Sequence, residues 1–211
     1  MSAVLPSDVL WATGDPRRFD GPWLPAEAAV VARSVEKRRR EFGCGRHLAR
    51  SLLSRLGFEV AALPPSSDRR VPWPLEVVGS VSHCEDLCLV AVARRQDWTS
   101  VGVDIEPDTP LAADTLPIVT TASEQARFQP SLPAQVWGKA AFVAKEAYYK
   151  AQFELTRRFL EFEDVEVHFE RPPARAQIVS FQCSSSRAPS LTGRLLRSDG
   201  HVWAFSGLPQ S

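Results

Sequence analysis

Two carboxylates separated by one residue form the first group in the chain that could support chemistry. They are Asp104 and Glu106, in a segment that reads GVDIEP at residues 102–107. If this segment is a strand, both side chains project from one face, about 7 Å apart, and the apolar residues project from the other. Such a pair suits a hard cation such as Mg²⁺, which proteins hold through one or two carboxylates together with phosphate oxygens and water. A strand whose polar face simply meets solvent would show the same alternation.

A second group lies in the segment KEAYYK at residues 145–150. On a helix, Glu146 and Lys150 are four residues apart and share a face, with Lys145 at its edge. This arrangement could supply a third carboxylate for the metal and two ammonium groups for phosphate oxygens. The alternative is an exposed salt bridge between Glu146 and Lys150, worth roughly 0.3–0.5 kcal/mol.

A histidine, His83, ends a predicted strand in the segment SVSHC at residues 80–84. We weigh a structural role for His83 against a role as a ligand or a base. A zinc site built from His83, Cys84 and Cys88 has loose ligand spacing and no obvious fourth partner, so the sequence does not favour it.

Positive charge is concentrated between Arg33 and Arg55, where eight basic residues stand against two acidic ones. The apolar residues of this segment recur at helical spacing, and Arg39, Arg46 and Arg50 flank the apolar stripe instead of opposing it. A solvated face is the usual meaning of such a charge run. Arginines at the edge of a buried stripe could also grip a half-buried anion bidentately.

The elements that must position these groups follow from hydrophobic periodicity. We predict one helix over residues 26–56 and another over residues 137–153. Alternating apolar runs predict three strands between the two helices and four after the second. Their ranges are 77–83, 87–93, 100–106, 165–169, 177–181, 193–197 and 202–206. Residues 1–24 show no clear periodicity, so we expect them to wrap the surface.

This order of helix, strands, helix, strands predicts an α+β fold of two units, with a cleft between them. We expect the division after residue 103, which gives units of residues 1–103 and 104–211.

The composition excludes several classes of protein. With 44% hydrophobic and 24% charged residues among 211, the chain is not expected to be disordered. No apolar run approaches the roughly 18 residues of a membrane span, and the first residues lack the pattern of a secretory signal. The four cysteines show no CxxC spacing, so we expect reduced thiols and a cytoplasmic protein. A net charge of zero argues against a general nucleic-acid coat.

Together, the order and spacing of these segments resemble the 4′-phosphopantetheinyl transferase superfamily, in particular its enterobactin-synthetase-component-D type. GVDIE lies about forty residues before KEAxYK, and SxSH lies about twenty residues before GVDIE. The similarity extends from Arg38 to Val167 and includes RRREFGCGRHLAR, Trp137 and LTRRFLEFEDVEV. It implies two similar α+β subdomains related by a pseudo-twofold axis, with coenzyme A in the cleft between them.

The resemblance also implies an activity. Members of the family move the phosphopantetheine arm of coenzyme A to a serine of an acyl, aryl or peptidyl carrier protein and release 3′,5′-ADP. We therefore expect a Mg²⁺-dependent transferase of the holo-[acyl-carrier-protein] synthase type, with Mn²⁺ as an alternative metal. Its partners would be carriers of polyketide, nonribosomal peptide or fatty acid synthases, as in secondary metabolite biosynthesis. We expect a monomer with no nucleic-acid or membrane partner.

The motifs that match assign the metal and catalytic residues. Asp104, Glu106 and Glu146 correspond to the family's Mg²⁺ ligands. Glu146 is the candidate base for the acceptor serine, directly or through a water, with its pKa lowered by the metal and two lysines. Lys150 would neutralise or protonate the departing 3′,5′-ADP.

The residues expected to contact coenzyme A come from the same motifs. They are Arg38, Arg46, Arg69, Ser82, His83, Lys145 and Lys150. Arg39 is an alternative to Arg38, because helix phase and motif alignment disagree there. Arg70 is an alternative to Arg69, because the loop DRRVPWP is compressed.

In this family the carrier protein lies against the second unit, near the segment that here covers residues 111–128. Leu116, Ile118 and Val119 would give it an apolar docking patch, unless they are ordinary loop packing.

Two other functions compete with the transferase. One is a Mg²⁺-dependent nucleotide hydrolase that uses the same carboxylates. The other is a binding module that holds coenzyme A or nucleic acid on residues 33–55 without chemistry.

Overall fold

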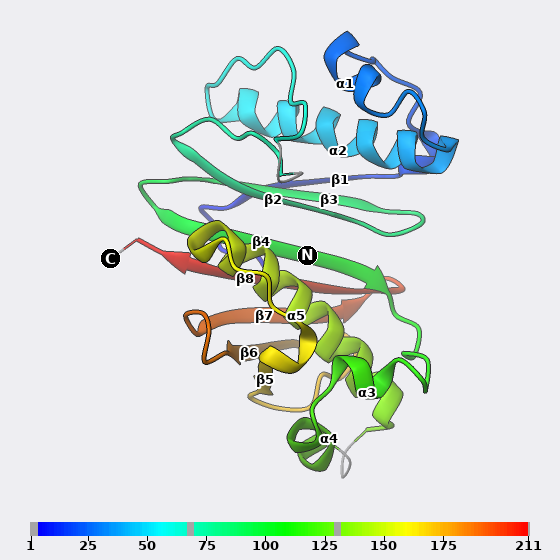
Figure 1. The fold of residues 1–211 in the computed structure, drawn as a ribbon, viewed down its shortest axis with the longest axis vertical. Coiled ribbons are helices and arrows are strands. Elements are labelled where there is room, and N and C mark those ends of the chain that lie inside the picture. The colour runs from blue at the N-terminus through cyan, green and yellow to red at the C-terminus, as the bar shows by residue number, and fades with distance from the viewer. Residues whose placement is uncertain (1–3, 67–69, 129–131, 211) are drawn as a thin grey trace.

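The computed structural model describes residues 4–66, 70–128 and 132–210, and two antiparallel sheets follow one another along the length of the molecule (Figure 1). The N-terminal sheet has the order β1-β3-β2, and the C-terminal sheet has the order β4-β8-β7-β6-β5. The prediction of an α+β fold is confirmed. The strands span Leu10–Gly14 (β1), Val77–His83 (β2), Cys88–Arg94 (β3), Trp98–Pro107 (β4), Glu166–Phe169 (β5), Ile178–Ser184 (β6), Leu191–Ser198 (β7) and His201–Pro209 (β8).

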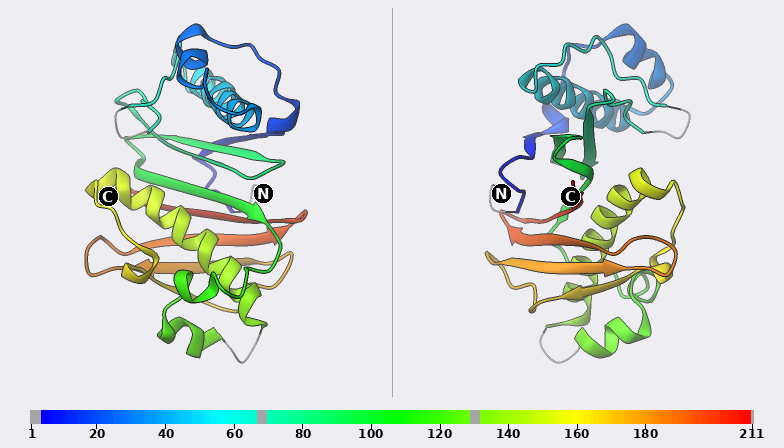
Figure 2. Two further views of the ribbon diagram at one scale, coloured as in Figure 1. Left: turned by 45° about the vertical axis from the view of Figure 1, so that its right-hand side comes forward. Right: turned by 90° about the vertical axis from the view of Figure 1, so that its left-hand side faces the viewer.

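Helix α2, Glu36–Arg55, covers one face of the N-terminal sheet (Figure 2). Its apolar stripe, which includes Leu52 and Leu53, packs against Val90 and Val92 of β3. The prediction of a single helix over residues 26–56 is wrong, because a short helix α1, Pro25–Val30, precedes α2. The backbone turns between them at residues 31–35.

Strand β1 lies in the segment for which no periodicity was found. It pairs with β3 in antiparallel register, from Leu10 opposite Val92 to Gly14 opposite Cys88. All five of its residues are half-buried, so the strand has no alternation of buried and exposed side chains that a sequence pattern could reveal.

The C-terminal sheet carries helix α5, Ala134–Thr156, across one face (Figure 1). The buried face of α5, with Ala144 and Tyr148, packs on Val179 and Leu195 of the sheet. Two short helices, α3 (Leu116–Val119) and α4 (Ala122–Phe128), lie near the N-terminal end of α5. No helix in the described parts of the chain has the length and apolarity that crossing a bilayer requires.

The two sheets meet where β2 runs beside β4, and serine hydroxyls replace the backbone ladder there. The Ser80 hydroxyl accepts a hydrogen bond from the Val103 amide at 3.1 Å, and the Ser82 hydroxyl accepts one from the Ile105 amide at 3.3 Å. Val103 and Ile105 point into a core that both units share, together with Leu89 of β3 and residues of β8.

The predicted division after residue 103 falls within β4, which pairs with β8 along its whole length. A division near residue 97 keeps this strand whole, and on that basis we propose an N-terminal unit of residues 4–97 and a C-terminal unit of residues 98–210. Each unit has a helix on an antiparallel sheet, which fits a pseudo-twofold arrangement.

Gly102 sets the distance between β4 and α5. A Cβ atom at this position would lie 2.0 Å from the carbonyl oxygen of Ala147, so the helix rests directly on the strand backbone. Because side chains at alternate strand positions share a face, Asp104 and Glu106 lie on the same face as Gly102. This close approach brings them under the helix that carries Glu146 and Lys150.

Candidate active-site cleft

A cavity of about 760 Å³ lies between α2 and β2 of the N-terminal unit and the C-terminal half of α5. Its volume is in the range of small-molecule sites. Four cationic side chains and two carboxylates line it, along with several aromatic rings. The charged residues are Arg38, Arg46, Arg70, Lys150, Glu41 and Glu154.

Arg38 and His83 are in direct contact in the wall of this cleft. The Arg38 guanidinium lies 3.1 Å from Nε2 of His83, and Nδ1 of the same ring lies 3.7 Å from the Glu41 carboxylate. Burial lowers the pKa of His83, and Arg38 lowers it further against the opposing effect of Glu41. The ring is therefore held neutral at pH 7, and Arg38 supplies the positive charge.

Arg46 is a buried cation in the wall of the cleft. Its Nε atom donates to the Leu63 carbonyl oxygen at 2.7 Å, and its guanidinium lies 4.5 Å from the centre of the Phe42 ring. Burial lowers its pKa to about 10, so it stays charged at neutral pH. Its orientation is fixed before any ligand binds.

The structure distinguishes Arg38 from Arg39, the two arginines between which the sequence did not decide. Arg38 lines the cleft, whereas Arg39 lies over the Trp23 ring and pairs with Glu36. In the following loop, Arg69 lies outside the described residues. Its neighbour Arg70 lines the cleft and donates to Glu154 at 2.8 Å.

Asp104 is the most buried of the three predicted metal ligands, with 4% of its surface exposed. Its Oδ1 atom accepts hydrogen bonds from the Ser82 hydroxyl and from Lys150, each at 2.7 Å. Its Oδ2 atom is buried and has no partner. An unpaired buried carboxylate oxygen is costly, and a cation beside it would remove that cost.

Glu106 and Glu146 lie near Asp104, and their pKa values are raised. Burial is the main cause for both, and repulsion from Asp104 adds to it. Lys139, 3.4 Å from Glu106, opposes the shift at Glu106, and Lys150 opposes it at Glu146. Lys150 lowers the pKa of Glu146, as expected for a lysine of this motif, but among the protein's own groups burial outweighs it and the net shift is upward.

The three carboxylates fit a hard divalent cation by their chemistry. All their donor atoms are oxygens, and the carboxylates repel one another in a partly buried space. The oxygens of these three carboxylates do not all lie within 4.8 Å of one another. Among the described residues, the one group that meets this distance is Cys84, Asp86 and His201. Binding a single ion between the three carboxylates would require side-chain rotations that draw them together.

Lys145 does not take the position predicted for it. Its ammonium group is buried and donates to the carbonyl oxygen of Val119 at 2.8 Å, to Glu124 at 2.9 Å and to the carbonyl oxygen of Phe162 at 3.0 Å. All three protons are used inside the C-terminal unit. A separation of five residues rotates the helix by about 140°, so Lys145 and Lys150 point to different sides, and the ammonium group of Lys145 has no proton free for a phosphate.

Ser82 also has a different place from the one expected. Its hydroxyl donates to Asp104 and accepts from the Ile105 amide, so it is fully engaged in the seam between the units. Ser82 therefore orients the Asp104 carboxylate, and its one hydroxyl proton is not free for a ligand.

Comparison with known proteins covers almost the whole chain. A family profile described as the 4′-phosphopantetheinyl transferase N-terminal domain matches residues 26–93, and one described as the 4′-phosphopantetheinyl transferase superfamily matches residues 100–205. This chain belongs to the 4′-phosphopantetheinyl transferase superfamily.

Three relatives resemble this chain at 35–42% identity. The 4′-phosphopantetheinyl transferase PptT of Mycobacterium tuberculosis is 42% identical over 70% of this chain and 65% of its own length. The 4′-phosphopantetheinyl transferase Npt of Nocardia iowensis is 35% identical over 84% and 86%. Enterobactin synthase component D of Salmonella typhi is 35% identical over 61% and 54%. The matched region thus covers about two thirds of the mycobacterial protein and about half of the Salmonella one.

The cleft of this superfamily member and the carboxylates beside it involve residues that sequence reasoning missed. Glu41 and Glu154 hold His83 and Arg70 in place, and Lys139 pairs with Glu106. Lys139 lies seven residues before Glu146, and this spacing places both on one face of a helix. The pattern was therefore present in the sequence, whereas the roles of Glu41 and Glu154 depend on contacts between distant segments.

Proposed function

We propose that the chain transfers the phosphopantetheine arm of coenzyme A to the serine hydroxyl of an apo carrier protein, as a holo-[acyl-carrier-protein] synthase type transferase. One observation carries the proposal. Lys150 lines one end of a cationic cleft and donates to Oδ1 of the buried Asp104 carboxylate beside it, whose other oxygen has no partner. Family membership gives this arrangement its substrate.

The cationic end of the cleft suits the 3′-phosphate of coenzyme A. Arg46 presents a buried, fixed guanidinium, and Arg38 presents a more exposed one beside the neutral ring of His83. Arginine binds phosphate through paired N–H donors, and a partly buried site strengthens each contact.

Asp104, Glu106 and Glu146 would hold Mg²⁺ or Mn²⁺ at the other end. When bound, the ion would neutralise charge on the pyrophosphate of coenzyme A during transfer. Lys150 lies between the two ends and donates to Asp104 at 2.7 Å. It is placed to stabilise charge on the departing 3′,5′-ADP.

The acceptor serine must lose its proton as its oxygen bonds to the β-phosphorus and the bond to the bridging oxygen breaks. Glu146 is our candidate base, because its carboxylate lies near Asp104 and Glu106, where the reacting pyrophosphate would be held. The proton passes to Glu146 directly or through a water, and the electron pair of the broken bond leaves with 3′,5′-ADP.

The proposed docking patch for the carrier is smaller than the sequence suggested. Ile118 is 66% exposed, but Val119 is buried and Leu116 packs against Gly138 of α5. Ile118 thus remains as the one exposed apolar side chain of the three. We propose carrier proteins of polyketide, nonribosomal peptide or fatty acid synthases as partners, a monomeric state and a cytoplasmic location.

Intact-mass spectrometry of purified apo carrier proteins tests this function. Each carrier is incubated with the full chain, coenzyme A and Mg²⁺, with EDTA in a parallel reaction. The proposal predicts a gain of one phosphopantetheine arm that EDTA abolishes. Release of 3′,5′-ADP without any carrier would instead support a hydrolase, and binding of coenzyme A without turnover of any carrier would support a binding module.

A further inference from the structure

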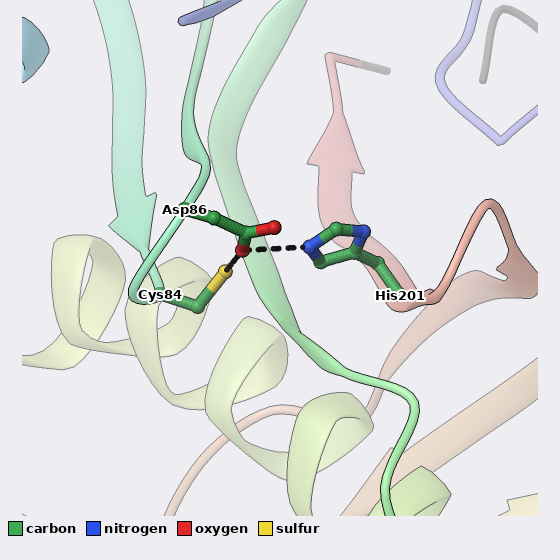
Figure 3. A group of neighbouring side chains, drawn as sticks. All are labelled: Cys84, Asp86 and His201. Carbon is green, nitrogen blue, oxygen red and sulfur yellow. Dashed lines mark hydrogen bonds and ion pairs between the residues drawn. The ribbon is translucent and has the colours of Figure 1, made fainter. Parts of the chain in front are cut away.

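Three potential metal ligands converge outside the cleft, where the two units meet (Figure 3). Cys84 and Asp86 lie in the turn between β2 and β3, and His201 is the first residue of β8. Their ligand atoms all lie within 4.8 Å of one another. Asp86 is 115 residues from His201 in the chain, so only the fold brings them together.

Two of the three ligand-to-ligand distances in this group are close to those of a tetrahedral zinc site, and the third, from sulfur to nitrogen, is within 4.8 Å. With zinc–sulfur bonds of about 2.3 Å and zinc–nitrogen or zinc–oxygen bonds of about 2.0 Å, neighbouring ligands lie about 3.5 Å (S to O) and about 3.3 Å (N to O) apart. Sγ of Cys84 lies 3.4 Å from Oδ1 of Asp86, and Nε2 of His201 lies 3.0 Å from the same oxygen. The donors therefore need only small shifts to enclose one ion.

The second nitrogen of His201 is fixed as it is in many metal sites. Nδ1 lies 2.9 Å from the carbonyl oxygen of Asp199. A carbonyl oxygen only accepts hydrogen bonds, so Nδ1 carries a proton, and in the neutral ring the lone pair of Nε2 points at the Asp86 carboxylate. Two acceptors facing each other need either a second ring proton or a cation between them. Metal-bound histidines commonly donate their other N–H to a backbone carbonyl in this way.

The group is sheltered yet open on one side. Cys84 is 8% exposed, and the side chains of His201 and Asp86 are 13% and 37% exposed. A water molecule could therefore occupy a fourth position. Thiolate, imidazole and carboxylate together favour zinc over the hard cations that suit an all-oxygen site.

We propose that Cys84, Asp86 and His201 bind one Zn²⁺ ion, which links the β2–β3 turn of the N-terminal unit to strand β8 of the C-terminal unit. This site differs from the combination of His83, Cys84 and Cys88 considered from the sequence. His83 faces Arg38 in the cleft, and Cys88 is fully buried against Ala49 and Leu52 of α2. The proposal does not depend on the transferase activity.

Cobalt binding tests the site, because a cysteine thiolate bound to Co²⁺ gives a charge-transfer absorption that carboxylates do not. The full chain is stripped with a chelator, supplied with excess Mg²⁺ and titrated with Co²⁺ and then with Zn²⁺. We expect one Co²⁺ per chain, with a thiolate band that Zn²⁺ removes. Cys84→Ser should abolish the band, and Asp86→Asn and His201→Gln should weaken Zn²⁺ binding at least about 100-fold. Glu85→Gln and His168→Gln alter an exposed neighbour and an exposed histidine outside the site, and should bind normally.

Thermal unfolding with and without Zn²⁺ provides the second measurement, since a ligand that binds only the folded state raises the melting temperature. Zn²⁺ should raise it in the wild type and in both control variants, but not in Cys84→Ser. The absence of a thiolate band, its persistence in Cys84→Ser, or equal Zn²⁺ binding by the site variants and the wild type would overturn the proposal.

Discussion

Two lysines of helix α5 each pair with a carboxylate from another element, and the two pairs differ in how many of their hydrogen-bonding groups have partners. On the side facing α3 and α4, Lys145 uses all its protons, and Glu124 also accepts the backbone amides of Thr121 and Val167. On the side facing the cleft, Lys150 pairs with Asp104, whose second oxygen has no partner. The first pair is closed to any ligand, and the second is open to one.

This difference distinguishes a lysine that stabilises the fold, Lys145, from one that is available to a ligand, Lys150. The sequence alone does not make that distinction. Both lysines belong to one motif, and both pair with a carboxylate at under 3 Å. Only the unsatisfied oxygen and the adjoining cavity distinguish them. A buried polar atom without a partner is rare in folded proteins, so it indicates where a ligand belongs.

The largest effect should come from breaking the closed pair. Lys145→Met leaves the Glu124 carboxylate buried and unpaired, and we expect it to lower the free energy of unfolding by about 3–5 kcal/mol. Lys150→Met should lower it less, by about 1–2 kcal/mol, because Asp104 keeps the Ser82 hydroxyl and water reaches the lysine, whose side chain is 25% exposed. Urea unfolding followed by circular dichroism measures both. Equal losses in the two variants would erase the contrast between the pairs.

Removing charge from the open pair should stop chemistry while preserving the fold. We expect Asp104→Asn to reduce carrier modification at least about 100-fold, because it removes a metal ligand and the partner of Lys150. Circular dichroism and the melting temperature should change little. Asp97→Asn, on the exposed turn before β4, is the matched control and should modify carriers at the normal rate.

The cationic end should act through binding. Arg46→Gln should weaken coenzyme A binding about tenfold or more, as expected for the loss of one charged phosphate contact, and titration calorimetry measures this. The loss should shrink when 3′-dephospho-coenzyme A is the ligand. Arg39→Gln, outside the cleft, serves as the control. If both arginine variants bind equally well, the 3′-phosphate lies elsewhere.

The smallest expected effect is a gain in stability. Folding raises the pKa of Glu146, so the folded state disfavours its ionised form. This cost in folding free energy is present when the pH is above the pKa of Glu146 in the folded state. It is absent when the pH is below the pKa of Glu146 in the unfolded state. Glu146→Gln should therefore stabilise the metal-free protein slightly at pH 7.5 and not at all near pH 4, while carrier modification is lost. Melting curves in EDTA at the two pH values measure the difference.

Hydrophobic alternation predicted most of the fold around the site. The run at residues 77–83 is strand β2, and the alternation at 100–106 places Val103 and Ile105 in the core with Asp104 on the opposite face. Helix α5 was also predicted, over residues 137–153, because this segment is rich in alanine, lysine and glutamate. These features are local, and each needs only a window of several residues.

The errors arose where distant contacts decide the outcome. Strand β1 forms because it pairs with β3. The Ser82 hydroxyl is hydrogen-bonded to Asp104 and Ile105 of β4, a strand that begins 16 residues later in the chain. Lys145 was assigned by its motif, although helix phase places it away from Lys150. The group of Cys84, Asp86 and His201 has no spacing that a sequence pattern could detect.

The central claim is that one end of the cleft binds coenzyme A and the other performs the transfer. Measuring both coenzyme A affinity in EDTA and the rate of carrier modification for Asp104→Asn and Arg46→Gln tests it most directly. The account predicts that Asp104→Asn keeps its affinity and loses the rate at saturating coenzyme A. Arg46→Gln should lose affinity and recover most of its rate when coenzyme A is raised. Two variants that lose affinity and rate in the same proportion would contradict it.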